Sequence, residues 1–305
     1  MTLSPRLPRL TLAAFSAAVL LGGANFVAVR LSNQELAPFW GAGLRFGLAA
    51  MLFVMMAFFL RLRWPHGRLL ALTVVYGALA FAIPYALLYW ALTQATAGTA
   101  TVVMAAVPLV TLLLAVAQRI ERFTVRALAG SILALTGIAW MVLGSQGLSA
   151  PAGAVLAMLG ATLAVGESII LAKQLSANHP AMTNAVAMTI AALLLIVLSA
   201  SASEAWALPS QPDVAAALVY LVTLGSVGLF ILVLLVVRTW TSSASSYMFV
   251  LFPVVTLGLA AWLIDEPVTL PAVLGAALVM AGVWFGALSR GMPATPAGPG
   301  AARRD

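Results

Sequence analysis

Long apolar stretches alternate with short polar ones along almost the whole chain. About 20 consecutive apolar residues are enough for a helix to cross a hydrocarbon core of about 30 Å. A helix also satisfies its own backbone hydrogen bonds, which lipid cannot do. The pattern therefore predicts an all-α membrane protein with ten transmembrane helices, over residues 10–30, 38–60, 69–92, 97–118, 125–144, 152–173, 181–201, 213–237, 243–264 and 268–289.

The connections between these helices are short, so they leave no room for a water-soluble domain. Only residues 290–305 stand apart. They are rich in Gly, Pro and Ala without periodicity, which predicts a disordered tail.

Composition supports a lipid environment. Charged residues make up 8% of the chain and hydrophobic residues 63%, against about 25% and about 45–50% in soluble domains. The absence of cysteine excludes disulfides and thiolate metal sites. The net charge of +7 comes from arginines scattered between apolar runs, a pattern typical of membrane loops, so we expect no nucleic-acid partner.

Residues 107–144 recur as residues 252–289. Laid over each other without a gap, the two segments share thirteen identities in thirty-eight positions. The shared residues include the pairs Pro108 and Pro253, Glu121 and Glu266, Thr124 and Thr269, and Gly137 and Gly282. The sequence therefore predicts two structural repeats of five helices each, over 10–144 and 152–289.

An odd number of helices per repeat makes the second repeat enter the membrane from the opposite side. Because cytoplasmic loops collect Lys and Arg, the two copies of one turn should then differ in charge. QRIERFTVR, residues 118–126, carries three arginines, whereas LIDEPVTLP, residues 263–271, carries none and has two acids. With the N-terminus inside, thirteen of the 15 basic residues face the cytoplasm. Both termini are therefore predicted to be cytoplasmic; we call the two sides the predicted inner and the predicted outer side.

Inverted repeats favour a secondary transporter. Two similar halves that exchange conformations expose a central cavity to alternate sides of the membrane. A passive channel is the alternative with the same topology, although the spans show no ring of charge and no filter motif. The spans also hold no carboxylate pair, no HExxH motif and no Ser-His partnership, so we expect neither an enzyme nor a bound metal or cofactor.

Four segments carry a resemblance to a known family. They are GGANFVAVR at 22–30, PFWGAGLRF at 38–46, the hairpin at 105–144 and its copy at 252–289. In order and spacing these resemble the EamA-type branch of the drug/metabolite transporter superfamily, over about residues 10–289. The resemblance implies a ten-helix fold with a central cavity, residence in a bacterial inner membrane, and export of metabolites such as amino acids or drugs. Its aromatic-amino-acid exporter group is the functional analogue that we favour.

Two charges lie well inside predicted spans, and such charges mark functional sites. Arg45 lies about 10 Å from the outer end of the second helix, and Glu167 about 9 Å from the inner end of the sixth. Together they predict a site for an amino-acid zwitterion, with the carboxylate toward Arg45 and the ammonium toward Glu167. The glutamate is also a departure from the residues common in the family at this place.

Each charge has a competing interpretation. Arg45 is either a solute ligand or a structural lock that binds helix-end carbonyls. Glu167 is either a solute ligand, the site of a coupling proton whose pKa is raised by burial, or the local partner of Lys173.

Polar and aromatic side chains near the expected cavity complete the set of candidate solute ligands. Pro84 interrupts the third helix, where it frees a carbonyl and kinks the chain. Small polar runs open the fourth and ninth helices, where either packing or solute binding explains them. The candidates beside Arg45 and Glu167 are Asn25, Tyr85, Tyr89, Thr99, Ser168, Ser243 and Ser245, and the candidate hinges are Pro84, Pro108 and Pro253.

The sequence thus predicts an inner-membrane exporter of small metabolites, with amino acids favoured. Cationic drugs, purines or other small metabolites are the alternative cargo. The expected partners are the solute and the lipid bilayer, and the chain acts as a monomer or a homodimer.

Overall fold

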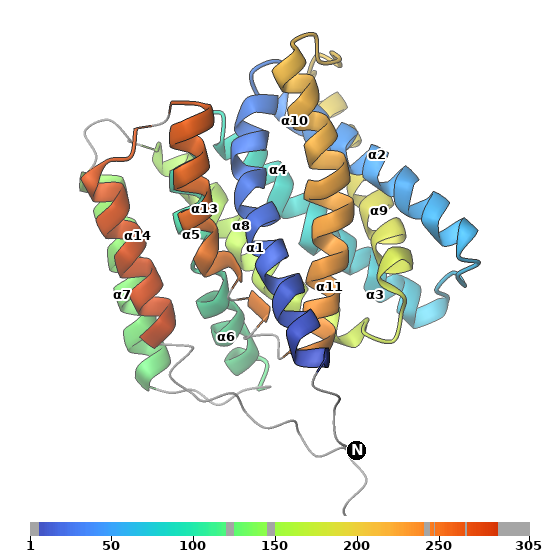
Figure 1. Cartoon of the computed structure of the whole chain (residues 1–305), viewed down its shortest axis with the longest axis horizontal. Helices are drawn as coiled ribbons and strands as arrows, with labels where there is room; N and C mark the ends of the chain where they lie inside the picture. The colour runs from blue at the N-terminus through green and yellow to red at the C-terminus, as the bar shows by residue number, and fades with distance from the viewer. Residues whose placement is uncertain are drawn as a thin grey trace, which may run out of the picture.

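The computed structural model describes residues 6–119, 125–144, 150–240, 245–246, 248–265 and 267–285, and every element among them is a helix (Figure 1). The first repeat contains α1 (Arg6–Ser32), α2 (Pro38–Phe59), α3 (Gly67–Gly77), η1 (Ala78–Ala82), α4 (Ile83–Ala91), α5 (Ala97–Met104), α6 (Val107–Ala117) and α7 (Val125–Gly144). The second contains α8 (Ala152–Gln174), α9 (Pro180–Ser201), α10 (Pro212–Val222), η2 (Thr223–Gly228), α11 (Leu229–Thr239), α13 (Met248–Leu263) and α14 (Leu270–Val283).

The predicted all-α membrane fold is confirmed: seven helical segments of the described residues are long and apolar enough to cross a membrane, and α13 and α14 are shorter apolar helices. Three predicted helices are interrupted: residues 69–92 form α3, η1 and α4, residues 97–118 form α5 and α6, and residues 213–237 form α10, η2 and α11. Each interrupted segment still runs through an apolar stretch of at least 21 residues. The breaks therefore bend or widen a spanning helix without ending it. The predicted tail at 290–305 lies outside the described residues.

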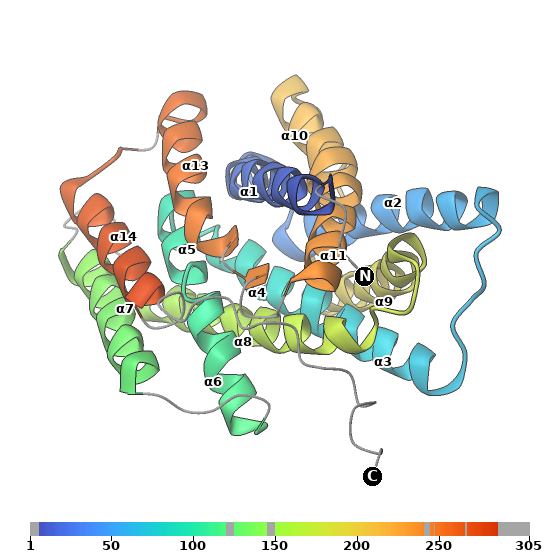
Figure 2. The same cartoon turned by 60° about the horizontal axis from the view of Figure 1, so that its bottom comes forward.

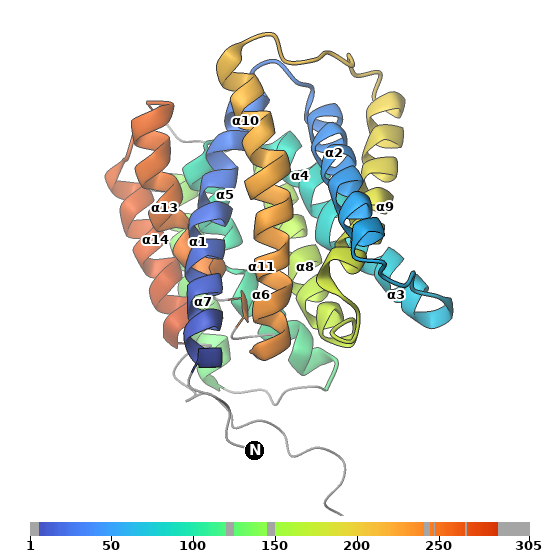
Figure 3. The same cartoon turned by 45° about the vertical axis from the view of Figure 1, so that its right-hand side comes forward.

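Helix packing follows the inverted repeat. Helix α1 packs against α10, α11 and α13 of the second repeat, and its counterpart α8 packs against α4, α5 and α6 of the first. Equivalent helices also pair directly, α2 with α9 at one flank and α7 with α14 at the other (Figures 2 and 3). The two halves therefore enclose a common centre, and each contributes the same elements to it.

The α7–α14 pair depends on a close backbone approach. A Cβ atom added at Gly137 would lie 2.8 Å from the carbonyl oxygen of Gly275. Small residues let membrane helices approach each other closely where lipid gives no hydrophobic driving force. Gly137 belongs to a glycine pair of the repeat, so this contact explains why a glycine recurs there.

Two π-helical turns of the described residues, η1 and η2, occur at equivalent positions of the two repeats. Turn η1 begins at Ala78 and η2 at Thr223, 145 residues later, which is the same offset as between the two hairpins. After each turn an amide donates to the carbonyl five residues earlier, Ile83 to Ala78 and Leu229 to Leu224. Single π-helical turns often mark functional sites in helices.

Loops on the predicted outer side tie the two repeats together. The Glu204 carboxylate accepts hydrogen bonds from the backbone amides of Phe39 (3.1 Å) and Trp40 (2.7 Å) at the start of α2. A carboxylate is stabilised at this position because the helix N-terminus carries free N–H groups and partial positive charge. Trp40 also stacks on Trp206, with ring centroids 5.1 Å apart. The α1–α2 and α9–α10 loops therefore act as one unit.

Candidate solute cavity

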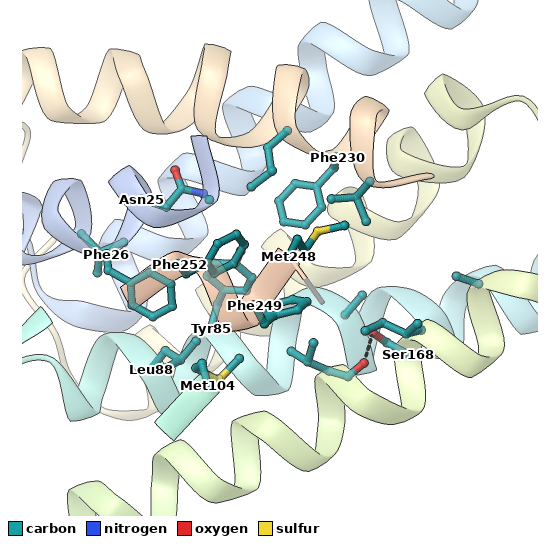
Figure 4. A pocket seen from close by; sticks show the side chains of 18 of the residues that line it. Asn25, Phe26, Tyr85, Leu88, Met104, Ser168, Phe230, Met248, Phe249 and Phe252 are labelled. Carbon is teal, nitrogen blue, oxygen red and sulfur yellow. Dashed lines mark hydrogen bonds between the residues drawn. The ribbon is translucent and has the colours of Figure 1, made fainter. Parts of the chain in front are cut away.

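A cavity lies at the centre of the helix bundle, with a volume of about 80 Å³. Its walls come from α1, α4, α8, α11 and α13, with single contributions from α2, α3 and α5. Most of the lining is apolar, and seven lining residues are aromatic. Figure 4 shows Tyr85 of the first repeat close to Phe249 and Phe252 of the second in the cavity wall.

The cavity lining obeys the pseudo-twofold symmetry of the repeats. Four residues of α1 and four of α8 line the cavity, and each pair is 143 residues apart. They are Gly22 and Val165, Asn25 and Ser168, Phe26 and Ile169, and Val29 and Ala172. Helices α4 and α11 match in the same way at an offset of 145, through Tyr85 and Phe230, Leu88 and Val233, and Leu92 and Val237. The cavity therefore lies on the pseudo-twofold axis.

Arg45 breaks this symmetry. Its side chain is fully buried and lines the cavity. Nε donates to the Ser226 hydroxyl at 2.8 Å, Nη2 donates to the Gly225 carbonyl at 2.8 Å, and Nη1 lies 3.5 Å from the Tyr89 hydroxyl. Helices α2 and α9 start 142 residues apart, so the position equivalent to Arg45 is Ala187. The first repeat thus supplies a buried cation, and the second repeat supplies its two shortest acceptors, the Ser226 hydroxyl and the Gly225 carbonyl.

The π-helical turn η2 explains why a mid-helix carbonyl is open to Arg45. The Leu229 amide donates to Leu224 and Ser226, and so bypasses the carbonyl of Gly225 four residues earlier. The Gly225 oxygen accepts from Asn25 Nδ2 at 3.0 Å as well as from Arg45. Glycine is required at 225, because a Cβ atom there would lie 2.2 Å from Asn25 Oδ1.

Aromatic rings surround the guanidinium. The Arg45 Cζ atom lies 5.0 Å from the ring centroids of both Phe46 and Tyr85, within the range of cation–π attraction. Tyr85 meets Phe46 edge-on at 4.7 Å and Phe230 at 6.4 Å. Tyr85 and Phe230 are symmetry equivalents, so this aromatic contact crosses the pseudo-twofold axis.

The cavity brings together six of the nine predicted solute-site residues. They are Asn25, Arg45, Tyr85, Tyr89, Ser168 and Ser245. The Ser168 hydroxyl donates to the Val165 carbonyl of its own helix at 2.8 Å. Thr99 is buried and takes part in the N-cap of α5, because its amide donates to the Thr96 hydroxyl at 3.1 Å. Ser243 lies outside the described residues.

Glu167 does not line the cavity in this structure, so it does not face a common solute with Arg45 as the zwitterion site requires. The lining face of α8 is formed by Val165, Ser168, Ile169 and Ala172. Glu167 precedes Ser168 by one position and is therefore turned away by about 100°. Its carboxylate instead accepts a hydrogen bond from Gln118 Nε2 at 2.6 Å.

Lys173 and Arg30 bind helix C-termini at opposite ends of the cavity. Lys173 Nζ donates to the Trp240 carbonyl after α11, so the predicted local pairing with Glu167 is not formed. Arg30 Nη1 donates to the Leu92 carbonyl after α4 at 2.6 Å. Cations are favoured at helix C-termini because of the helix dipole. Arg30 and Lys173 are 143 residues apart, so they are symmetry equivalents.

The three predicted hinge prolines sit in different surroundings. Pro84 directly follows the π-helical turn η1, and Pro108 follows the break between α5 and α6. Pro253 lies inside the continuous helix α13. Two of the three therefore adjoin an interruption in a spanning helix, and their role as hinges stays a prediction.

Nothing in the described part of the chain forms a metal site, because no three His, Asp or Glu side chains gather there. The model of the EamA-like transporter family matches residues 9–143 and again residues 152–287. The chain belongs to the EamA-like transporter family. This EamA-like protein is thus a multi-pass membrane transporter of small molecules, with its cavity between the two family units.

One solved structure, titled "Crystal structure of protein", is similar to this EamA-like chain. It shares 18% sequence identity and has a TM-score of 0.67, over 92% of this chain and 96% of the other. At that identity the likeness shows the fold alone. No curated protein matches the sequence.

Several cavity residues were missed from the sequence. Phe230, Phe249, Phe252 and Met248 line the cavity but read as ordinary apolar positions. A usable signal existed for Phe230, because it repeats Tyr85 at the offset that relates the two hairpins. The acceptors of Arg45 carried no such signal, since a π-helical turn leaves the hydropathy pattern unchanged.

Proposed function

We propose that this EamA-like protein is a secondary carrier that exports small carboxylate-bearing metabolites, amino acids among them, across a bacterial inner membrane by alternating access. The observation that carries the proposal is Arg45, a buried cation in the lining of a cavity on the pseudo-twofold axis. A guanidinium binds carboxylates in a fixed, often bidentate geometry. A charge placed inside a membrane protein is costly and is kept where it serves function.

The paired contacts of Arg30 and Lys173 support alternating access. Arg30 fastens the end of α1 to the end of α4 on the predicted outer side. Lys173 fastens the end of α8 to the end of α11 on the predicted inner side. We define these as the outer latch and the inner latch. Opening one latch while the other stays closed exposes the cavity to one side only.

The second candidate role of Glu167 is coupling to a proton. Its contact with Gln118 lies between α8 and α6, at the predicted inner end of the bundle. Protonation of the carboxylate removes its charge, and that change would bias the position of α6 relative to α8. A role in proton coupling needs no contact with the solute, and Glu167 does not line the cavity.

The proposed topology has both termini in the cytoplasm, with repeats over 10–144 and 152–289 and a tail at 290–305. It is supported by three basic residues between α2 and the start of α3, namely Arg61 and Arg63 in the connecting loop and Arg68 in the first turn of α3. The acids Glu35 and Glu204 lie in loops on the opposite side.

Counterflow in liposomes tests the carrier. The purified protein is reconstituted, and uptake of labelled amino acids is measured against an internal pool of unlabelled solute. Arg45→Lys keeps the charge but cannot hold three acceptors in a planar fork. Arg68→Ala is the matched control, because Arg68 is exposed in the first turn of α3, outside the cavity lining.

We expect saturable counterflow in the parent and in Arg68→Ala, and a rate at least about tenfold lower in Arg45→Lys. Tenfold corresponds to about 1.4 kcal/mol, at the lower end of the worth of a charged hydrogen bond. Flux without saturation or counterflow contradicts a carrier and indicates a channel. Parent kinetics in a folded Arg45→Lys variant would make Arg45 a structural lock.

A further inference from the structure

The cavity has one sign of charge. Arg45 is the single charged side chain among the described residues that line it, and neither Asp nor Glu is present there. Glu167 binds Gln118, and Glu35 and Glu204 bind loop backbone on the predicted outer side. An anionic group of a solute therefore meets a buried cation, while a cationic group meets no opposite charge.

Neutral acceptors near Arg45 are already in use or turned away. The Gly225 carbonyl receives two donors, from Asn25 and Arg45. Asn25 Oδ1 makes no hydrogen bond, but it packs against the backbone of Gly225, where an added Cβ would lie 2.2 Å from it. An ammonium group taken out of water needs a carboxylate or several acceptors to offset its desolvation. No carboxylate lines the cavity beside Arg45, and the Gly225 carbonyl and the Ser226 hydroxyl already receive its guanidinium.

The guanidinium retains capacity for an anion. It has five N–H donors; the contacts with Ser226, Gly225 and Tyr89 use three of them, and the Tyr85 hydroxyl interacts with it as well. The contact with the Tyr89 hydroxyl, at 3.5 Å, is the longest of the three. A carboxylate near Nη1 would make a shorter, charge-assisted hydrogen bond than this hydroxyl does.

The rest of the cavity wall suits an aromatic body. Phe26, Phe249 and Phe252 line one side and Tyr85 and Phe230 another (Figure 4). Phe249 and Phe252 already pair at 4.9 Å, and Tyr85 stands edge-on to Phe46 at 4.7 Å. Offset and edge-to-face contacts between rings add to the gain from burial alone.

We infer that the cavity selects solutes with an aromatic ring and a single carboxylate, and that it does not recognise an ammonium group. This inference rests on the proposed carrier function and narrows its substrate class to aromatic monocarboxylates. The carboxylate binds Arg45, and the ring lies among Phe249, Phe252 and Tyr85. An aromatic amino acid binds through the same two features, but its ammonium is desolvated without a partner.

Three phenyl compounds separate recognition of the carboxylate from recognition of the ammonium group. 3-Phenylpropanoate carries only the carboxylate, 2-phenylethylamine carries only the ammonium, and phenylalanine carries both. Binding to the purified full-length protein in detergent is measured from the ligand-dependent rise in its melting temperature, which follows the dissociation constant. Binding is used because neutral phenylpropanoic acid crosses liposome membranes unaided.

We expect 3-phenylpropanoate to bind at least about tenfold more tightly than phenylalanine, and 2-phenylethylamine to produce no rise. Arg45→Lys should abolish the preference, whereas Arg68→Ala should keep it. Phe249→Leu keeps the charge of the cavity and should weaken both carboxylates alike, so it tests the ring contact even where Arg45→Lys fails to fold.

Equal or tighter binding of phenylalanine overturns the inference, as does any binding of the amine. If none of the three compounds binds while counterflow of another solute is saturable, the inference fails and the carrier function stands. If no solute at all shows counterflow, the proposed function fails with it.

Discussion

Arg45 in α2 donates a hydrogen bond from Nη2 to the carbonyl of Gly225 in η2, at 2.8 Å. The two residues are 180 positions apart and belong to different repeats. A charged side chain of one half is therefore fixed to an irregular backbone turn of the other half, beside the cavity. Any movement of one repeat against the other must carry or break this contact.

The glycine at 225 makes a first prediction. Gly225→Ala should destabilise the protein by about 1–3 kcal/mol, because the added Cβ would lie 2.2 Å from Asn25 Oδ1. Thermal unfolding in detergent measures the change. Asn25→Ala in the same chain removes the clashing atom and should restore part of the loss. Gly258→Ala is the control, since nothing lies within 4 Å of its added Cβ.

If Gly225→Ala and Gly258→Ala melt at the same temperature, the close approach between α1 and η2 is wrong. If Asn25→Ala gives no rescue, the clash lies with the Tyr220 carbonyl, 3.3 Å from the same added atom, and Asn25 is not the reason for the glycine.

The two latches make a second prediction. Arg30→Gln should open the predicted outer side, and Lys173→Gln the predicted inner side, because each removes a charged donor from a helix C-terminus. The chain has no cysteine, so single introduced cysteines report accessibility without background. Val29→Cys and Ala172→Cys provide symmetry-equivalent probes in the cavity lining.

A membrane-impermeant thiol reagent should label Val29→Cys faster in Arg30→Gln than in the parent, from the predicted outer side. In the same way, the reagent should label Ala172→Cys faster in Lys173→Gln than in the parent when it is added from the predicted inner side. Each latch variant is the control for the other. Equal labelling of a probe in both variants would show that the contacts only stabilise helix ends.

A third prediction concerns pH. The Ser210 hydroxyl and then the Gln211 backbone donate to the Glu35 carboxylate, and they hold its pKa below the usual value of 4.5. Since the folded-state pKa is lowered, the stabilisation is present above the unfolded-state value and is lost as pH falls through the folded one.

Melting temperatures measured between neutral and strongly acidic pH test this contact. The parent should lose more stability on acidification than Glu35→Gln, which cannot titrate. Ser210→Ala should fall between them, because it removes one donor. Parallel curves for parent and Glu35→Gln would show that the α1–α2 and α9–α10 loops do not depend on this carboxylate.

Glu167 makes the fourth prediction. If this carboxylate couples transport to a proton, Glu167→Gln should flatten the pH dependence of counterflow while leaving solute affinity unchanged, because the side chain lies outside the cavity lining. Gln118→Ala removes its hydrogen-bond donor but keeps the carboxylate, so counterflow in this variant should stay dependent on pH. An unchanged profile in Glu167→Gln would leave the residue a structural contact between α6 and α8.

The spanning helices could be predicted because their length and hydropathy are set by the thickness of the bilayer. The breaks at η1 and η2 could not, because a change from fourth- to fifth-neighbour hydrogen bonds leaves the pattern of apolar residues intact. Arg45 was identified by its charge alone. Its partners Ser226 and Gly225 required the structure, since nothing in the sequence marks these two residues as acceptors for a buried arginine.

The sequence predicts that Glu167 lies in the solute site, but the structure places it outside the cavity lining. Glu167 lies within α8, the predicted sixth helix, but a position along a helix does not fix the face on which a side chain lies. The lining residues of α8 recur at positions 165, 168, 169 and 172, the spacing of one helical face. The acid falls between them. The repeat indicates the same face of α8, because α1 lines the cavity at the matching positions 22, 25, 26 and 29.

The central claim is that the cavity on the pseudo-twofold axis binds the solute and is exposed to each side of the membrane in turn. Ser168→Cys tests it most directly, because Ser168 lines the cavity and the chain has no other thiol. The rate of labelling by an impermeant reagent is measured from each side separately, with and without a transported solute. The account predicts labelling from both sides, slowed by the solute in both cases. Labelling from one side only, at a rate that the solute does not change, would contradict it.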